Sequence, residues 1–236
     1  MIEPEERVLD WAPSRDPRNQ SYPVRAILGS PRRRNKLWRP GPVLDQGREG
    51  ACVGFAWAAE ALSTPVAVDL ARTAAPADTD LFARELYRAA QKVDEWPGEA
   101  YSGTSVNAGA KAMRTFGLLH EYRWCFGIDD VTDAILTKGP VVLGIPWLDG
   151  MYRAPDGVLT PAGSVVGGHA ILACGYRVND QRLDGRDGII LQNSWGGGWG
   201  SKGRAVIRAD HLATLLANGE AALATRRSYG RTGGTT

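Results

Sequence analysis

The chain changes its pattern near residue 140, from helical spacing of apolar residues to short continuous apolar runs. Before that point, apolar residues recur three and four positions apart, the spacing of a helix with one buried face. After it, the apolar runs alternate with turns rich in Gly, Pro and Asp, which is typical of buried strands. Helices followed by strands predict an α+β fold, with a helical lobe, a sheet lobe and a site in the cleft between them.

The pattern predicts individual elements. Asp80, Ser105 and either Asp129 or Asp130 are interpreted as helix caps, and Gly117 as a helix stop. A last short helix is expected after Asp210. The predicted helices cover 51–62, 81–93, 105–117 and 129–140, and the predicted strands cover 141–145, 169–176, 188–194 and 204–209.

These elements divide the chain into an arm, two lobes and a tail. Residues 1–40, rich in Pro and Arg, are interpreted as an N-terminal arm or short pro-segment that packs on the body through Trp11 and Trp38. The helical lobe is expected over 41–117, the β-rich lobe over 118–228 and a frayed tail over 229–236.

Composition indicates an ordinary globular protein, with 43% hydrophobic residues and a net charge of +2. This charge gives no reason to expect nucleic acid as a partner. No apolar run reaches the roughly 18 residues that span a membrane, and the first residues do not resemble a signal peptide. We therefore expect a cytoplasmic protein, with a virion or export by another route as alternatives. Three cysteines form a poor disulfide framework, so Cys125 and Cys174 are expected to be buried thiols, with a disulfide between them as the alternative.

Cys52 stands at the start of the helix predicted over 51–62, directly after "LDQGREGA". A thiol attacks a carbonyl only as its thiolate, and a free cysteine titrates near about 8.5. The positive end of a helix favours the thiolate, and a nearby imidazole would take up its proton. Cys52 is thus either a nucleophile or a small apolar residue in a buried helix.

Among the histidines, His169 is the best candidate for an acid–base group. It opens the apolar run "HAILACGY" after Gly167 and Gly168, which would let another chain or a ligand approach closely. His120 lies at a junction between the lobes, and His211 lies among charged residues. The alternative for His169 is a structural histidine at the start of a strand.

Two further stretches carry side-chain amides. In "LQNSWGGGWGSKG", Asn193 would orient the His169 ring, and Trp195 would cover that hydrogen bond. The alternative is a Gly-rich turn whose tryptophans anchor the core. Gln46, shortly before Cys52, would stabilise an oxyanion together with the Cys52 backbone N–H.

Taken together, "DQGREGACVGF", "YSGTSVNAGAKAMRTFG", "GGHAILACGY" and "LQNSWGGGWGSKG" resemble, in this order, the papain-like cysteine peptidases. The resemblance implies the papain-like two-lobe fold, whose β lobe is antiparallel and barrel-like. It implies Cys52 as nucleophile, His169 as acid–base and Asn193 as its orienting group. It also implies that the side-chain amide of Gln46 binds the oxyanion and that Gly103 and Gly168 contact the substrate. Trp195 would contact the substrate too and cover the hydrogen bond between His169 and Asn193. Neither a metal nor a cofactor is implied.

The sequence departs from the family at two positions near the nucleophile. Val53 stands where the family usually has Trp, and Glu49 stands where many members have a disulfide-bonded Cys. Together with the short arm, this is typical of a bacterial or phage branch without the usual disulfides and long pro-segment. The charge of Glu49 leads to the hypothesis of a preference for basic substrate residues.

The function expected from these residues is a cysteine endopeptidase that hydrolyses peptide bonds through a thioester. Its expected partner is a polypeptide substrate, with neither nucleic acid nor membrane, and an assembly partner is left open. One alternative is the same chemistry on peptidoglycan or on an isopeptide bond of one partner protein. The other is a structural or binding component of a phage particle or a secretion assembly.

Overall fold

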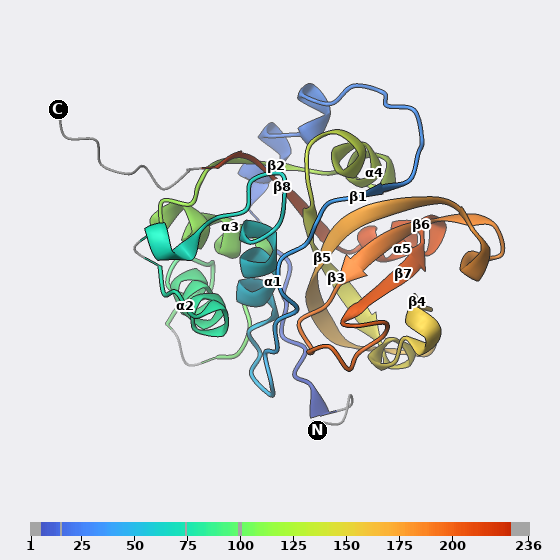
Figure 1. The fold of residues 1–236 in the computed structure, drawn as a ribbon. Coiled ribbons are helices and arrows are strands. Elements are labelled where there is room, and N and C mark those ends of the chain that lie inside the picture. The colour runs from blue at the N-terminus through green and yellow to red at the C-terminus, as the bar shows by residue number, and fades with distance from the viewer. Residues whose placement is uncertain (1–5, 15, 74, 99–100, 228–236) are drawn as a thin grey trace.

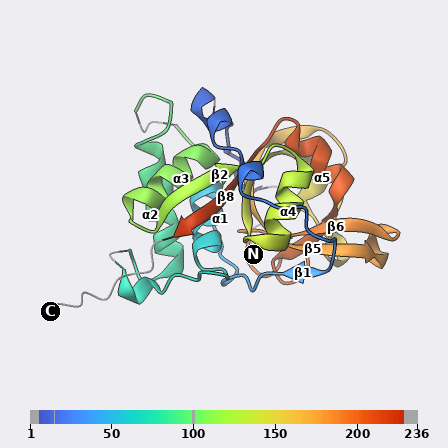
Figure 2. The same cartoon turned by 90° about the horizontal axis from the view of Figure 1, so that it is seen from above.

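Three helices stand beside a curled sheet in the computed structural model, which describes residues 6–14, 16–73, 75–98 and 101–227 (Figure 1). The view from above separates the two parts, with these helices on one side and most strands on the other (Figure 2). This is the α+β arrangement predicted from the change of pattern near residue 140. The predicted tail 229–236 lies outside the described residues. The three helices are α1 (Cys52–Ala61), α2 (Thr79–Gln91) and α3 (Val106–Thr115).

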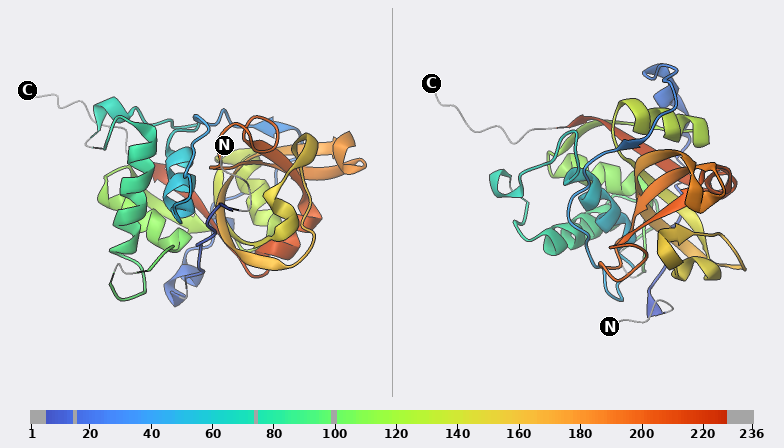
Figure 3. Two further views of the ribbon diagram at one scale, coloured as in Figure 1. Left: turned by 90° about the horizontal axis from the view of Figure 1, so that it is seen from below. Right: turned by 45° about the vertical axis from the view of Figure 1, so that its right-hand side comes forward.

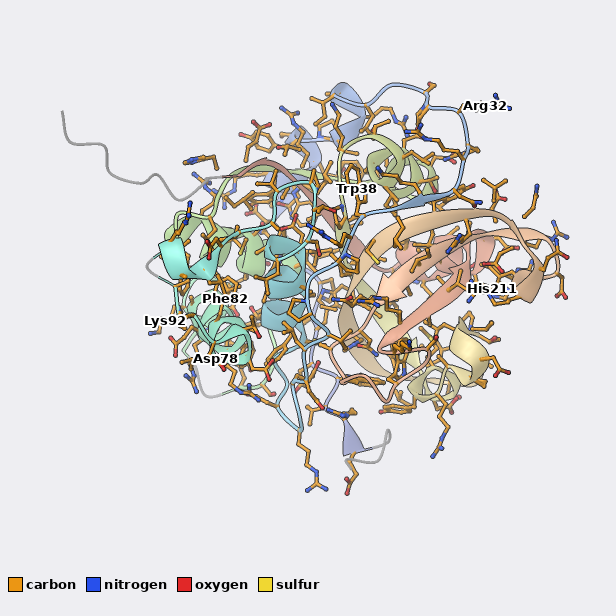
Figure 4. All side chains as sticks on the ribbon, in the orientation of Figure 1. Arg32, Trp38, Asp78, Phe82, Lys92 and His211 are labelled. Atoms are coloured by element: carbon orange, nitrogen blue, oxygen red, sulfur yellow. The ribbon has the colours of Figure 1, made fainter. Side chains whose placement is uncertain are left out.

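Helix α1 is the centre of the helical part, because all ten of its residues are buried. Its small residues let its neighbours come close. A Cβ atom at Gly54 would lie only 2.3 Å from the backbone oxygen of Ala83 in α2. Phe82, labelled in Figure 4, packs edge-to-face on Phe116 with ring centroids 6.1 Å apart. A well-packed α1 therefore gives its first residue, Cys52, a fixed position.

The eight strands form one sheet in the order β2-β8-β3-β5-β6-β7-β4, with β1 paired to β5. Every pair is antiparallel except β4 with β7. The sheet curls strongly (Figure 3), yet within the described residues its end strands β2 and β4 do not pair and close a barrel. The strands are β1 (Lys36–Leu37), β2 (Leu119–Trp124), β3 (Val141–Leu148), β4 (Val158–Leu159), β5 (Val165–Asp180), β6 (Arg186–Gln192), β7 (Arg204–Arg208) and β8 (Glu220–Arg227).

Two more helices, α4 (Ile128–Thr137) and α5 (Ala209–Leu216), pack against the sheet. Apolar residues of α4, such as Val131 and Ile135, share a buried core with Leu143 of β3 and Ile171 of β5. The core on the helical side instead joins α1, α2 and α3 to the opposite face of the sheet, through residues such as Val142, Leu172 and Ala222.

The helix caps differ in part from the predicted ones. Ser105 caps α3 as predicted, accepting a hydrogen bond from the Ala108 N–H at 3.1 Å. Asp80 is wrong as a cap, because Asp78 accepts from the Leu81 N–H at 2.7 Å and Asp80 lies within the first turn of α2. For α4 the predicted caps were also wrong. Gly127 precedes that helix, and the two aspartates lie in its first turn.

All four predicted strands are present in longer or shifted form, as β3, β5, β6 and β7. The sequence analysis assigned no strand to β2 or β8, which pair with each other. Their sequences, "LHEYRW" and "EAALATRR", lack clear alternation of apolar and polar residues. Their strand conformation comes from this pairing and from that of β8 with β3, which are tertiary contacts.

The arm is held along the body rather than free. Arg25 and Arg33 form ion pairs with Asp133 of α4, at 2.7 and 3.2 Å. Trp38 donates its indole N–H to the backbone oxygen of Ile135 at 2.8 Å. All three cysteines are buried and free of disulfides. No helix among the described residues is long and apolar enough to cross a membrane.

Candidate active site

Cys52 is the first residue of α1 and is fully buried. Its thiol lies against backbone groups of Ala170 in β5, directly after His169, and of Asp10 in the arm. The site is therefore assembled from the start of a central helix and the middle of a long strand. Both elements are rigid, because α1 packs directly against β5.

His169 and Asn193 form the central hydrogen bond of the site, with Nε2 of the ring 2.7 Å from Oδ1 of the amide. The same Oδ1 accepts the backbone N–H of Ser194 at 2.8 Å. An amide oxygen can only accept hydrogen bonds, so the ring must be the donor and Nε2 carries the proton. His169 Nδ1 is buried and has no hydrogen-bond partner among the described residues. This nitrogen is therefore the one with a free lone pair.

Two tryptophans cover the His169 ring. The ring centroid of Trp195 lies 4.9 Å from that of His169, and the centroid of Trp147 in β3 lies 4.7 Å away. Both indoles are buried, with relative exposures of 3% and 0%. They keep water from the His169–Asn193 hydrogen bond and confine the ring. Trp195 was predicted to lie here, whereas nothing in the sequence near Trp147 indicated its place.

Gln46 is buried and held from two sides. Its Oε1 accepts the hydroxyl proton of Ser194 at 2.7 Å, and its backbone N–H donates to the Ser194 oxygen at 2.9 Å. Its Nε2 donates to the backbone oxygens of Glu49 at 2.9 Å and of Val8 at 3.3 Å. Val8 belongs to the arm, so the amide of Gln46 already holds the oxygen of a peptide group.

The arm crosses the molecule at this point (Figure 1). Trp11 donates its backbone N–H to the Gly168 oxygen at 2.9 Å. On the other side, the Thr104 N–H donates to the Asp10 oxygen, and the Ala12 N–H donates to the Thr104 oxygen, both at 3.2 Å. Both bridges, Asp10 with Gly168 and Trp11 with Thr104, are parallel. The arm thus acts as an extra strand between the two lobes.

Glycines line the path of the arm. A Cβ atom at Gly103 would lie 1.8 Å from the Asp10 oxygen, and one at Gly168 would lie 2.2 Å from the Trp11 oxygen. Both positions therefore need glycine for a backbone to pass. Gly103 itself makes no hydrogen bond to the arm in the described residues. Its N–H is bound to the Tyr87 hydroxyl at 3.0 Å, so Thr104 provides the backbone pair.

The covered site disfavours charge on both reacting groups. Burial raises the pKa of the Cys52 thiol to about 11, although backbone N–H groups of Ala170 and Asp10 act in the opposite direction. Burial lowers the pKa of His169 to about 4, against the effect of the Asn193 hydrogen bond. With the arm in place the pair is therefore a neutral thiol and a neutral imidazole at pH 7.

The remaining candidates lie elsewhere or have other partners. Figure 4 shows His211, on α5, at the edge of the molecule away from α1. His120 lies on β2 and is exposed. The charge of Glu49 is compensated by Arg84, 2.8 Å away. Val53 is buried beside Gly109 of α3, and a Cβ atom added to Gly109 would lie 2.8 Å from a methyl group of Val53.

A cavity of about 900 Å³ lies against Trp195. Tyr152 lines one wall and stacks on Trp195 with ring centroids 5.9 Å apart. Arg7 of the arm reaches the edge of this cavity and donates to the backbone oxygens of Gly47 and Trp195. The arm therefore borders this cavity, through Arg7, as well as Cys52.

Comparisons with known proteins agree with this geometry. A family model described as papain family cysteine protease matches residues 98–224, just over half of the chain. Cathepsin Q of Rattus norvegicus is 34% identical over 84 residues, which are 35% of this chain and 24% of cathepsin Q. The match thus spans about a quarter of the length of that curated relative.

Solved structures of low identity share the fold. Xylellain, a cysteine protease from Xylella fastidiosa, has a TM-score of 0.61 at 18% identity, covering 93% of this chain and 92% of xylellain. The digestive procathepsin L2 proteinase of Tenebrio molitor larval midgut has a TM-score of 0.67 at 21% identity, covering 95% and 80%. The fold and the site define a protein built like a cysteine peptidase. The chain belongs to the papain family of cysteine proteases.

Proposed function

We propose that this chain is a cysteine endopeptidase in which Cys52 attacks a peptide carbonyl and His169 moves the proton. Asn193 holds the imidazole, and Gln46 and the Cys52 backbone N–H stabilise the oxyanion. The family model covers His169 and Asn193, whereas Cys52 and Gln46 lie outside the matched residues, so their roles are inferred from geometry.

One observation carries the proposal, namely that a peptide segment lies over Cys52 in this cleft. Backbone groups of Gly168 and Thr104 hold the arm by hydrogen bonds, as they would hold an extended substrate. The amide of Gln46 donates to a peptide oxygen of the same segment. These contacts involve only backbone groups of the arm, so they support a polypeptide as substrate.

The reaction follows from the free lone pair of His169 Nδ1. This nitrogen takes the proton of the Cys52 thiol, and the sulfur forms a bond to the substrate carbonyl carbon. Gln46 Nε2 and the Cys52 N–H bind the resulting oxyanion. The C–N bond then breaks as the imidazolium gives its proton to the leaving amine. Water, deprotonated by the same imidazole, hydrolyses the thioester and restores the thiol.

We further infer that the arm, as a short pro-segment, blocks this reaction until it moves. The group of the arm that faces the sulfur is the backbone N–H of Asp10. The carbonyl that reaches Gln46 belongs to Val8, two residues earlier. Cleavage requires one carbonyl group whose carbon faces the sulfur and whose oxygen binds Gln46. The arm does not present such a group, so it occupies the cleft without being in position to be cut.

The test compares peptide hydrolysis by the unaltered chain and by the Cys52→Ala variant at substrate concentrations high enough to displace the arm and give measurable turnover in the unaltered chain. Loss of the nucleophile should reduce turnover of a denatured protein substrate by at least about 1,000-fold, with little change in thermal stability. Cys174→Ala is the matched control, because that thiol is also fully buried but lies in the core with its Sγ near the Ile190 oxygen. Unchanged turnover in Cys52→Ala would contradict the proposal.

A further inference from the structure

A cavity of about 260 Å³ in the sheet lobe, called here the cationic pocket, is lined by four positively charged side chains. They come from β5, from the short turn that follows it and from the start of β7, and they are Arg177, Arg182, Lys202 and Arg204. No carboxylate is among the described residues that line the pocket. The whole chain has a net charge of only +2, so this pocket concentrates positive charge well beyond the average of the molecule.

Most of this charge has no counter-ion. Asp180 binds Arg182 through two hydrogen bonds, of 3.0 and 2.6 Å. These bonds lower the pKa of Asp180, and the charge of Arg177 adds to that effect, so this carboxylate stays ionised beside Arg182. Arg204 donates from Nε to a side-chain amide oxygen at 2.9 Å, and that acceptor is uncharged. Within the described part of the chain, neither Arg177 nor Lys202 forms an ion pair.

Lys202 has a backbone conformation that lysine rarely adopts. Its φ is 53°, in the left-handed region that favours glycine. Two hydrogen bonds of 2.8 Å close the turn around it, from the Gly203 N–H to the Trp199 oxygen and from the Ser201 N–H to the Arg204 oxygen. The side chain of Lys202 is exposed. Glycine would avoid the conformational cost at this position, so the presence of lysine indicates that its charge is used.

The donors of the pocket fit a phosphoryl group with several negative charges. A guanidinium binds phosphate oxygens through paired N–H groups, and an ammonium binds them as a compact charge. The hydroxyl of Ser201, which also lines the cavity, is a further donor. A single carboxylate brings one charge and two oxygens, which is too little for Arg177, Lys202 and Arg204 together. Phosphoryl groups bring more of both, and a small compound that carries them fits the volume of the pocket.

One wall of the cationic pocket is the turn that holds Asn193. The Asn193 backbone N–H donates to the Gly203 oxygen at 3.0 Å. Arg204 pairs with Gln192, the residue before Asn193, both in the strand register and through its side chain. An anion held between Arg177 on β5 and this turn would therefore restrain the backbone that carries Asn193.

We propose that the cationic pocket binds the phosphoryl groups of a small soluble compound through Arg177, Lys202 and Arg204. The bound anion supplies the missing counter-charge and ties the turn 199–204 to β5. This inference does not rest on the proposed peptidase function, because none of these three residues belongs to the groups that would act on a peptide.

The probe is inorganic diphosphate, titrated by calorimetry into the full chain at constant ionic strength. Lys202→Gln removes one charge and should weaken binding about 10-fold or more. Lys202→Gly removes the same charge but supplies the residue that the backbone favours, so it should fold as well as the unaltered chain and still bind weakly. Lys92→Gln is the matched control, because Lys92 is an exposed lysine at the end of α2 (Figure 4), and it should bind as tightly as the unaltered chain.

Hydrogen exchange then locates the site. Saturating diphosphate should slow amide exchange in 199–204 and at Asn193, and Lys202→Gln should remove this protection. No binding of diphosphate would overturn the inference, and so would protection confined to other segments. An equal loss of affinity in Lys92→Gln would also overturn it, because net charge alone would then attract the anion. Tighter binding of polyglutamate or of phosphatidic acid vesicles than of diphosphate, lost in Lys202→Gln, would assign the pocket to an acidic peptide or a membrane surface instead.

Discussion

The amide oxygen of Asn193 accepts two hydrogen bonds, from the His169 ring and from the Ser194 backbone. This double role fixes the amide, and the amide fixes the proton on Nε2 of the ring. Ser194 has a second task, because its hydroxyl holds Gln46. Neighbouring residues of one turn therefore position both the proposed acid–base group and the proposed oxyanion donor.

Gln46→Ala tests the oxyanion role. Removal of one preorganised donor should lower kcat by about 100- to 1,000-fold on peptide substrates, with a smaller effect on KM. Steady-state kinetics measures this split in a Trp11→Leu background, in which the arm lacks the indole hydrogen bond to Glu220 and is expected to bind less tightly. Gln181→Ala, an exposed amide in the turn after β5, is the control and should retain full activity. If KM rises instead at constant kcat, Gln46 binds the substrate and does not stabilise the transition state.

At this scale, the sequence indicated residues whose local context carries the chemistry. Cys52 at a helix start and His169 after two glycines are examples. It did not indicate Trp147, Thr104 or Glu220, because their positions depend on strand pairing. Trp147, for example, reaches His169 because β3 lies beside β5. Pairing partners are tertiary information that a single stretch of sequence does not contain.

Among the elements, β5 does most to organise the site. It carries His169, offers the Gly168 oxygen to the arm and packs against α1, while β3, β6 and β1 hold it in the sheet. The arm lies across it as an additional short strand. Arg7 anchors one end of that strand through Asp45 and two backbone oxygens, and its side chain is only 6% exposed.

Arg7→Ala should loosen the arm, because it removes a buried cation with three acceptors. We expect iodoacetamide to label Cys52 about 10-fold faster or more than in the unaltered chain. Arg48→Ala is the matched control, since Arg48 pairs with the arm residue Glu6 at the surface, and exposed pairs contribute little. Labelling that is as slow in Arg7→Ala as in the control would mean that other contacts hold the arm.

On the scale of the whole molecule, two buried groups make stability depend on pH in opposite directions. The folded-state pKa of Glu220, about 7, lies above its ordinary value of 4.5, so the folded protein holds more protons between these values. Glu220 therefore lowers stability as pH rises through this range. The folded-state pKa of His169, about 4, lies below its ordinary 6.5, so His169 raises stability as pH rises from 4 to 6.5.

Glu220→Gln separates the two contributions. The variant lacks the contribution of Glu220. As pH rises from 4.5 to 7, it should therefore gain stability relative to the unaltered chain, by up to about 3 kcal/mol. Urea unfolding at both pH values gives this difference in the free energy of unfolding. The Glu85→Gln change on the solvent-facing side of α2 should leave the pH dependence as it is. A constant difference between Glu220→Gln and the unaltered chain would show that Glu220 titrates normally.

The overall division into helices and sheet was predictable, because it depends on the period of apolar residues along the chain. The curvature of the sheet was implied only by the family resemblance, and the period of apolar residues indicated neither this curvature nor the path of the arm. The arm is fixed by backbone hydrogen bonds to Gly168 and Thr104, which any sequence with an N–H and a C=O can form. The backbone part of this binding leaves no mark in the sequence, whereas Arg7 and Trp11 make specific contacts whose partners are distant along the chain.

The arm also has a kinetic consequence, because it is part of the same chain as the cleft it fills. It acts as an internal competitor whose local concentration does not change when the protein is diluted. The apparent KM is the KM of the open form multiplied by one plus the ratio of closed to open form, while kcat stays the same. The enzyme would then respond to abundant substrate and remain nearly silent towards scarce substrate, with no separate inhibitor needed.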